Sequence, residues 1–511
     1  MTENTMQQAA TRLKSMIKPN VVGWFIMVIG IILRVRQYLV NRSFWADEAS
    51  LAYNLVTRTF SGLTQPLDYH QGAPVGFLFI EKTFILVLGK NEYVMRVFPL
   101  ISGIFAIYLL YLLAKTHIGI SGLFALLTFS VGWNLIYYSS ELKQYSSDVM
   151  VALLLVYLAT RCIRQDVSAK DFLLLGISGA IAIWISHPSA FVLAAIGSVI
   201  ALEKMTRKNY VPFVWISVIG IVWIGSFLVE YYVFLQPLAA DEYLRSYWDK
   251  AFMPLPPWSD LGWFKKTFYS MLLISLNTHI TAVLIVPLLI FIGSLSLFVR
   301  NRNVALLVIL PGLMVLIASA LEKYPLKDRF MLFLIPFLLL IISESLRLIY
   351  FFAAKWNRPL ALILSSLPAI LLIWHPGTTF DEFFRTTRGS DVKPVIQYIA
   401  KNRIPNDIVY VFHASDSAFS YYAPFYGLDT GKVIVGFSTP RKRLALEGFF
   451  DDVDRLKGNS RVWFIFSNIY DCGDCVGDMQ AFYVGYLNEF GVLLDQFNAS
   501  NANAYLYDLS P

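Results

Sequence analysis

The chain has 511 residues, of which 57% are hydrophobic and only 15% are charged, whereas a soluble globular protein carries about 25% charged residues. This composition excludes an ordinary soluble protein and predicts a polytopic α-helical membrane protein. The net charge of +7 does not indicate a nucleic acid partner, because the Lys and Arg residues form short clusters between apolar segments, where they set membrane topology.

Residues 1–20 are basic and lack a small-residue cleavage site, which predicts a cytosolic tail and not a removed signal peptide. Apolar segments of about 17–25 residues, long enough to cross a bilayer as helices, follow along the chain. The stretch 76–90 is shorter and carries Glu81 and Lys82, so we expect it to form an interfacial helix. We predict about eleven crossings, at residues 20–40, 94–114, 119–138, 147–163, 171–187, 189–203, 211–235, 272–299, 304–321, 330–352 and 358–375.

Basic clusters between the predicted spans indicate their orientation, since cytoplasmic loops carry an excess of Lys and Arg. With a cytoplasmic N-terminus, the clusters at 161–170, 204–208 and 347–358 all lie inside. An odd number of crossings then places the tail, from about residue 377, on the outer face. We expect a multi-pass protein of a bacterial inner membrane, with loop 41–93, loop 236–266 and the tail facing the periplasm.

The tail alternates predicted helices and strands, which indicates a small soluble α/β domain. Ser390 is the expected cap of the first tail helix. We therefore divide the chain into a transmembrane domain of residues 1–376, including loop 41–93, and an extracytoplasmic domain of residues 377–511. The expected tail helices are 391–401, 418–426, 441–456 and 478–490, and the expected strands are 407–412, 432–436, 461–466, 491–497 and 504–508.

Two adjacent carboxylates, Asp47 and Glu48, follow the first span directly, behind Phe44 and Trp45. Acids held at a membrane surface are costly to desolvate and are functional-site hypotheses by default. Neighbouring residues on a helix point about 100° apart, so the two carboxylates cannot share one role. One could act as a base in a cavity while the other pairs with a cation or the helix end. The alternative is a helix cap, because acids are common in first turns.

A dense polar run, Tyr137 to Asp148, separates two apolar spans. If it is helical, Glu141, Tyr145 and Asp148 share a face, and Lys143 is placed to meet an anionic head group. The alternative is an ordinary solvated turn. Such turns usually contain Gly, Pro or Asn, and this run has none, which favours a site.

The segment Glu322 to Phe330 carries Lys323, Lys327 and Arg329 on the predicted outer face, against the positive-inside bias. Asp328 could cap the next helix, which would place Arg329 in its first turn. A helix N-terminus with an Arg is a good phosphate site. The alternative is a cation that anchors lipid head groups.

The histidines and cysteines do not form a metal-ligand pattern. His70 and His187 are each isolated, which is more typical of a hydrogen-bonded structural residue than of a ligand. Cys472 and Cys475 are too few for a structural zinc site, and on an oxidising outer face we expect them to form a local disulfide. A redox-active pair is the alternative. We assign no metal site and no cofactor, and the sequence leaves open a divalent metal.

These motifs, in this order, resemble those of membrane glycosyltransferases of the GT-C fold. The chain is most similar to glycosyltransferase family 39, which includes protein O-mannosyltransferases and the aminoarabinose transferase of lipid A. The resemblance covers residues 20–375 and not the tail. It rests on Asp47-Glu48, on His70-Gln71-Gly72-Ala73-Pro74, on the run 138–146 and on Lys327-Asp328-Arg329.

The resemblance implies an inverting sugar transfer from a polyprenyl-phosphate donor at the outer face. Asp47 would take the proton of the acceptor hydroxyl, and one inverting step needs one base. Lys143 and Arg329, with Lys327 in the same motif, would bind the leaving phosphate. Glu48, Glu141 and Tyr145 would orient the base or the sugar, and His70 would line the acceptor side. The acceptor could be a protein hydroxyl, a glycolipid or a polysaccharide.

Two other classes of function remain open. A transporter or flippase of a lipid-linked sugar would also need cations and polar groups at the membrane. Transporters tend to show internal repeats or matched broken spans at mid-membrane, whereas the charged motifs here gather at one face. A sensor or scaffold, with the tail binding a partner, is the third interpretation.

Overall fold

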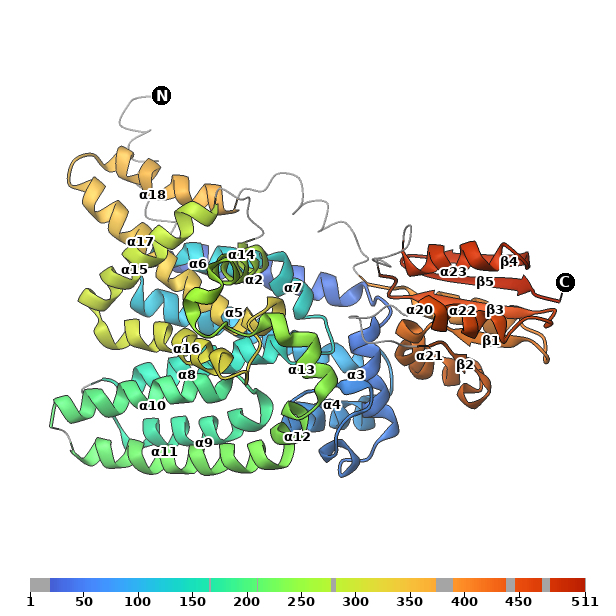
Figure 1. Cartoon of the computed structure of the whole chain (residues 1–511). Helices are drawn as coiled ribbons and strands as arrows, with labels where there is room; N and C mark the ends of the chain where they lie inside the picture. Colours follow the sequence, from blue (N-terminus) through green and yellow to red (C-terminus); the bar gives the residue numbers. More distant parts are fainter. Residues whose placement is uncertain are drawn as a thin grey trace. The chain divides into compact units, whose positions relative to one another are not determined.

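The computed structural model describes residues 19–164, 167–208, 210–276, 282–373, 389–437, 446–470 and 478–510 (Figure 1). The chain forms two compact units. The helical unit comprises Met1–Leu39, Ala73–Ile80 and Arg96–Phe384, and the sheet unit comprises Val40–Gly72, Glu81–Met95 and Arg385–Pro511.

The division of the first loop differs from our expectation. We expected loop 41–93 to belong with the transmembrane domain, but Val40–Gly72 groups with the tail. The reason is packing, because α3 (Ala46–Thr57) buries its apolar side chains and contacts α21 (Asp416–Tyr422) of the tail. The expected boundary near residue 376 stays a prediction, since residues 374–388 lie outside the described residues.

The helical unit contains the apolar helices that the sequence predicts. Among the described residues, seven helices are long and apolar enough to cross a membrane. They are built on α2 (Pro19–Leu39), α5 (Val97–His117), α8 (Tyr145–Cys162), α10 (Ser189–Thr206), α11 (Tyr210–Glu230), α16 (Arg302–Ala320) and α17 (Ile335–Ala354). The chain is therefore a multi-pass membrane protein, as predicted, and the count of eleven crossings stays a prediction.

The local sequence explains where two other expected spans begin, divide or end. Expected span 119–138 divides at Gly132, whose backbone is extended, into α6 and α7. A capping box at Ser168 begins α9, which ends before Pro188. Apart from α3, the other described α-helices before the tail are α4 (Val75–Leu88), α6 (Gly122–Val131), α7 (Trp133–Tyr138), α9 (Ala169–Ile185), α12 (Gln236–Ala239), α13 (Glu242–Trp248), α14 (Leu261–Leu276), α15 (Ala282–Arg300) and α18 (Arg358–Ile373).

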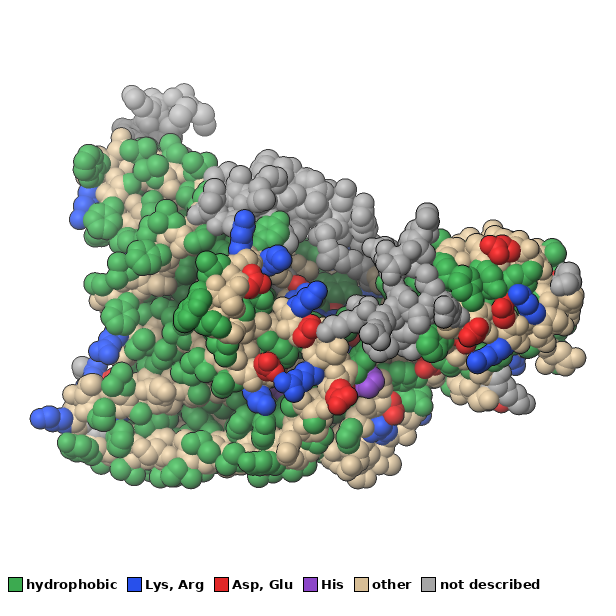
Figure 2. All heavy atoms as spheres, in the orientation of Figure 1, with side chains coloured by type: hydrophobic (Ala, Val, Ile, Leu, Met, Phe, Trp, Pro, Cys, Tyr) green, Lys and Arg blue, Asp and Glu red, His purple; other side chains and the backbone are tan. Residues whose placement is uncertain are grey.

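Helices α9, α10 and α11 pack against one another, and α8 contacts both α9 and α10 (Figure 1). The outer surface of α11 exposes Val214, Val218, Ile221 and Ile224. Figure 2 shows hydrophobic side chains spread over this part of the helical unit. An exposed apolar surface of this kind suits contact with lipid tails.

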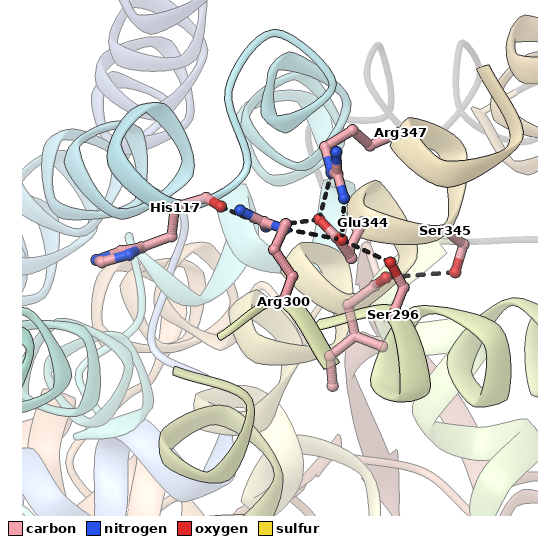
Figure 3. Close-up of polar contacts among 7 residues, drawn as sticks. His117, Ser296, Arg300, Glu344, Ser345 and Arg347 are labelled. Atoms are coloured by element: carbon pink, nitrogen blue, oxygen red, sulfur yellow. Dashed lines mark hydrogen bonds and ion pairs between the residues drawn. The ribbon is translucent and has the colours of Figure 1, made fainter. Parts of the chain in front are cut away.

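A buried charge cluster joins α5, α15 and α17 (Figure 3). Glu344 of α17 is fully buried and accepts hydrogen bonds from Arg300 at 2.8 Å and 3.2 Å, from Arg347 at 2.7 Å and 2.9 Å, and from Ser296 at 2.7 Å. Arg300 also donates to the carbonyl oxygen of His117 at 2.6 Å. One carboxylate thus pairs with two guanidinium groups, and Arg300 extends the cluster from α15 and α17 to α5.

Replacing Glu344 with Gln is expected to lower the free energy of unfolding by about 2 kcal/mol, because two partly buried Arg residues lose their counter-charge. Thermal unfolding of the purified protein in detergent measures the change. Glu322→Gln is the matched control, because Glu322 pairs with Arg245 at 2.6 Å where both side chains are more than half exposed. Its effect should be about 0–1 kcal/mol. Equal effects in the two variants would contradict a structural role for the cluster.

The sheet unit contains the α/β tail that the sequence predicts. Its five-stranded sheet has the order β2-β1-β3-β5-β4, with β2, β1 and β3 parallel and with β5 antiparallel to both β3 and β4. The strands are β1 (Ile408–Val411), β2 (Ile434–Val435), β3 (Val462–Ser467), β4 (Val492–Ala499) and β5 (Ala502–Asp508), and the tail helices are α20 (Val392–Asn402), α21, α22 (Leu446–Asp454) and α23 (Met479–Leu487).

Helices cover both faces of the central strand β3, all of whose residues are buried. Phe464 and Phe466 lie in one core with Phe449 of α22 and Tyr483 of α23, whereas α20 contacts β3, β4 and β5. The expected cap was wrong. Asp391, not Ser390, is the N-cap of α20, because the Ser390 hydroxyl is engaged with Asn468 instead. The predicted disulfide of Cys472 and Cys475 lies outside the described residues.

Candidate active site

The candidate residues fall into two groups, one in each unit, and each group is described by itself. In the sheet unit, α3 begins directly after Trp45, and Asp47 and Glu48 stand in its first turn. The positive end of the helix dipole favours carboxylates there. Glu48 is fully buried in an ion pair with Arg42, whose side chain is 5% exposed. Asp47 is only half-buried, so the two neighbours have different environments, as their angular separation predicts.

The turn that carries His70 is bound to the same helix. Asn54 of α3 donates to the carbonyl oxygen of Asp68 at 3.2 Å and accepts from its amide at 2.9 Å. Arg58 also pairs with the Asp68 carboxylate at 2.9 Å. Tyr69 and His70 have positive φ values of 61° and 52°, which are uncommon in residues other than Gly and concentrate at functional sites. The side chain of His70 is exposed.

In the helical unit, the polar run 137–148 is buried. Glu141 is fully buried, Lys143 is 4% exposed and Tyr145 is 4% exposed. The solvated-turn interpretation is therefore wrong. The helical interpretation is also wrong in part, because residues 139–144 form a turn between α7 and α8. Tyr145 and Asp148 lie in α8, but Glu141 does not share their helical face.

Arg329 lies against this run. Its guanidinium carbon is 5.4 Å from the ring centroid of Tyr145, and the ring of Phe330 meets the same tyrosine edge-on at 6.0 Å. A cation over an aromatic face keeps its charge while one side is shielded from water. The structure thus brings together two motifs that are far apart in the sequence.

In the motif Lys327-Asp328-Arg329 the expected cap was wrong, because Asp328 does not cap a helix. Its carboxylate instead accepts from the Ser270 hydroxyl at 2.7 Å, and its own φ is 46°. Arg329 is in the first turn of a 3-10 helix, η7 (Asp328–Leu334), which leads into α17. Lys327 is exposed.

The sequence analysis did not single out Arg34 and Glu230, which are buried charged residues of the helical unit. Arg34 of α2 is fully buried and donates to the carbonyl oxygens of Gly30, Phe129 and Ser130 at 3.0–3.1 Å. Glu230 of α11 is buried, with one oxygen 3.8 Å from a ring nitrogen of His187. A charged residue within an apolar span was the signal that could have identified Arg34 and Glu230.

His187 lies in the turn between α9 and α10, and its side chain is 18% exposed. Among the residues that the structure describes, no group of three or more His, Cys, Asp or Glu side chains is arranged to hold a metal ion. The structural interpretation of His187 stays a prediction, because the 3.8 Å separation from Glu230 is longer than a hydrogen bond.

The comparisons with known proteins give a family-model match over part of the chain and a shared fold. Residues 71–229 match the family model described as dolichyl-phosphate-mannose-protein mannosyltransferase. The chain is similar to the crystal structure of ArnT from Cupriavidus metallidurans bound to undecaprenyl phosphate, at 11% identity and a TM-score of 0.53 over 95% of this chain and 98% of that chain. It is also similar to the oligosaccharyltransferase AglB from Archaeoglobus fulgidus in complex with an inhibitory peptide and a dolichol-phosphate, at 10% identity and a TM-score of 0.48 over 94% and 74% of the two chains. No curated protein sequence matches the chain.

The likeness to ArnT spans almost the whole of both chains and shows a shared fold, the GT-C fold. The family match includes Glu141, Lys143 and Tyr145, but it begins after Asp47 and ends before Arg329. The family match and the fold together support a multi-pass membrane glycosyltransferase of the GT-C type.

Proposed function

We propose that the protein transfers a sugar from a polyprenyl-phosphate donor to a hydroxyl acceptor, with inversion, at the outer face of the cytoplasmic membrane. The observation that carries this proposal is the placement of Arg329 against Tyr145 at the start of the buried polar run. A cation and a buried polar surface in a membrane protein suit a phosphate that must leave as an anion. The ArnT structure of the same fold holds undecaprenyl phosphate, a donor-type lipid carrier.

Each residue then has one role. Asp47 is the base that takes the acceptor proton, and it suits this role because it is half-buried while Glu48 is bound to Arg42. Lys143 and Arg329 bind the phosphate of the donor, and Lys327 contributes charge at the surface. Glu141 and Tyr145 orient the sugar, and His70 lines the path of the acceptor.

A flippase of lipid-linked sugars is the second candidate. The buried, cation-bearing polar run 137–148 would serve the passage of a phosphate head group as well as its departure. The two functions differ in their products. In liposomes with a panel of polyprenyl-phosphate sugars and candidate acceptors, a transferase releases free polyprenyl phosphate. A flippase moves the intact lipid between leaflets without releasing it, and that outcome would overturn the proposal.

Replacing Arg329 with Ala is expected to raise the apparent KM for the donor about tenfold or more, because a charge-assisted bond to a phosphate contributes about 1.5–3 kcal/mol. Initial rates against donor concentration measure the change. Lys323→Ala is the control, since Lys323 is an exposed cation of the same segment. An unchanged donor dependence in Arg329→Ala would remove Arg329 from the phosphate site.

A further inference from the structure

Two backbone atoms at the start of α3 form hydrogen bonds with side chains of the tail. The amide of Phe44 donates to the hydroxyl oxygen of Tyr422 at 2.8 Å. The hydroxyl of Ser417 donates to the carbonyl oxygen of Ala46 at 3.3 Å. Tyr422 and Ser417 both belong to α21. Helix α21 of the tail therefore forms hydrogen bonds with the backbone on both sides of Trp45, directly before Asp47.

The hydroxyl of Tyr422 is itself fixed by a charged group. It donates to a carboxylate oxygen of Glu92 at 3.1 Å, and the same oxygen accepts from the Lys393 ammonium group at 2.7 Å. Tyr422 is 2% exposed and Glu92 is 6% exposed. Bonds to an ionised acceptor in a buried position are stronger than neutral ones, so the tyrosine hydroxyl has one defined orientation.

Packing supports the same arrangement. Phe44 is fully buried, with ring centroids 5.3 Å from Tyr421 and 6.3 Å from Tyr422. On the other side of Asp47, Glu48 is held by its ion pair with Arg42. Asp47 thus lies between Ala46 and Glu48, which are both held by these contacts, while its own side chain is half-buried.

We infer that the α/β tail is a positioning domain for Asp47, and that Tyr422 is a positioning residue that acts through Phe44 and the first turn of α3. This inference rests on the proposed function, in which Asp47 is the base. A misplacement of about 1 Å in a reacting group can cost about 10²-fold in rate. The tail therefore affects the rate of the chemical step through the backbone of residues 44–47.

The test compares Tyr422→Phe with wild type as full-length protein in liposomes. The variant keeps the ring that packs on Phe44 and loses only the hydroxyl. We expect kcat to fall about tenfold while the donor KM stays within about twofold. We also expect faster amide hydrogen exchange at residues 44–50, because the anchored turn gains freedom. Ser417→Ala, which removes only the bond to Ala46, should change both quantities in the same direction by a smaller factor.

Tyr426→Phe is the matched control. It is the same substitution in the same part of the tail, but the Tyr426 hydroxyl accepts from Gln397 of α20 at 2.9 Å. We expect wild-type kcat and wild-type exchange at residues 44–50. An equal loss of kcat in Tyr426→Phe, or unchanged exchange at 44–50 in Tyr422→Phe, would overturn the inference. The exchange result is independent of the chemistry, so it separates this inference from the proposed role of Asp47, which fails if Asp47→Asn remains active.

Discussion

Replacing Asp47 with Asn is expected to abolish measurable sugar transfer, a loss of about 10²–10⁴-fold in kcat, because an amide cannot accept the proton of the attacking hydroxyl. The fold should survive, since Asp47 is half-buried and Asn has nearly the same size as Asp. Release of free polyprenyl phosphate in liposomes measures the activity, and thermal unfolding in detergent measures the stability.

Asp47→Glu is a useful companion variant, because it keeps the carboxylate and moves it by about one methylene. We expect partial activity, since the group can still take a proton from a less favourable position. Full transfer by Asp47→Asn would remove this residue as the base and with it the proposed mechanism. Lipid movement between leaflets without release, in wild type and variant alike, would support the flippase instead.

Replacing Glu48 with Gln should mainly lower the stability of the protein. The buried Arg42 would lose its ion pair with Glu48, and breaking a buried pair in this way costs about 3–5 kcal/mol. We expect a lower unfolding temperature and faster proteolysis of loop 41–93. Activity should fall as the folded population falls.

Asp47→Asn and Glu48→Gln are matched controls for each other, because each replaces a carboxylate with an amide at adjacent positions of one helix. We expect the first to be stable and inactive, and the second to be unstable. A Glu48→Gln variant that folds as wild type yet transfers no sugar would make Glu48 the base. The double variant Arg42→Met with Glu48→Leu should recover much of the lost stability, since apolar residues often replace a buried pair without a penalty.

Much of the fold could be predicted because its signals are local. Long apolar runs gave the helices of the helical unit, and alternating periodicity gave each described strand and helix of the tail within a few residues. The wrong details were those that depend on a distant partner. Ser390 does not cap α20 because Asn468 engages its hydroxyl, and Asp328 does not cap η7 because its carboxylate accepts from Ser270.

In the candidate site, too, the sequence did not predict contacts between distant segments. Composition and charge were enough to single out Asp47, Lys143 and Arg329 as candidates, since ionisable groups beside apolar spans are costly to desolvate. No sequence pattern could indicate that the polar run forms a buried turn, or that Tyr145 lies under the guanidinium of Arg329.

By itself the sequence determined a membrane protein of many helices, an α/β tail, and the residue types that can bind a phosphate and take a proton. Only the tertiary structure decided that α3 packs with the tail, that Glu48 forms a buried ion pair with Arg42, and that Tyr422 accepts a hydrogen bond from the amide of Phe44. The physical reason is that periodicity and charge act along the chain, whereas burial and hydrogen bonding join segments that are hundreds of residues apart.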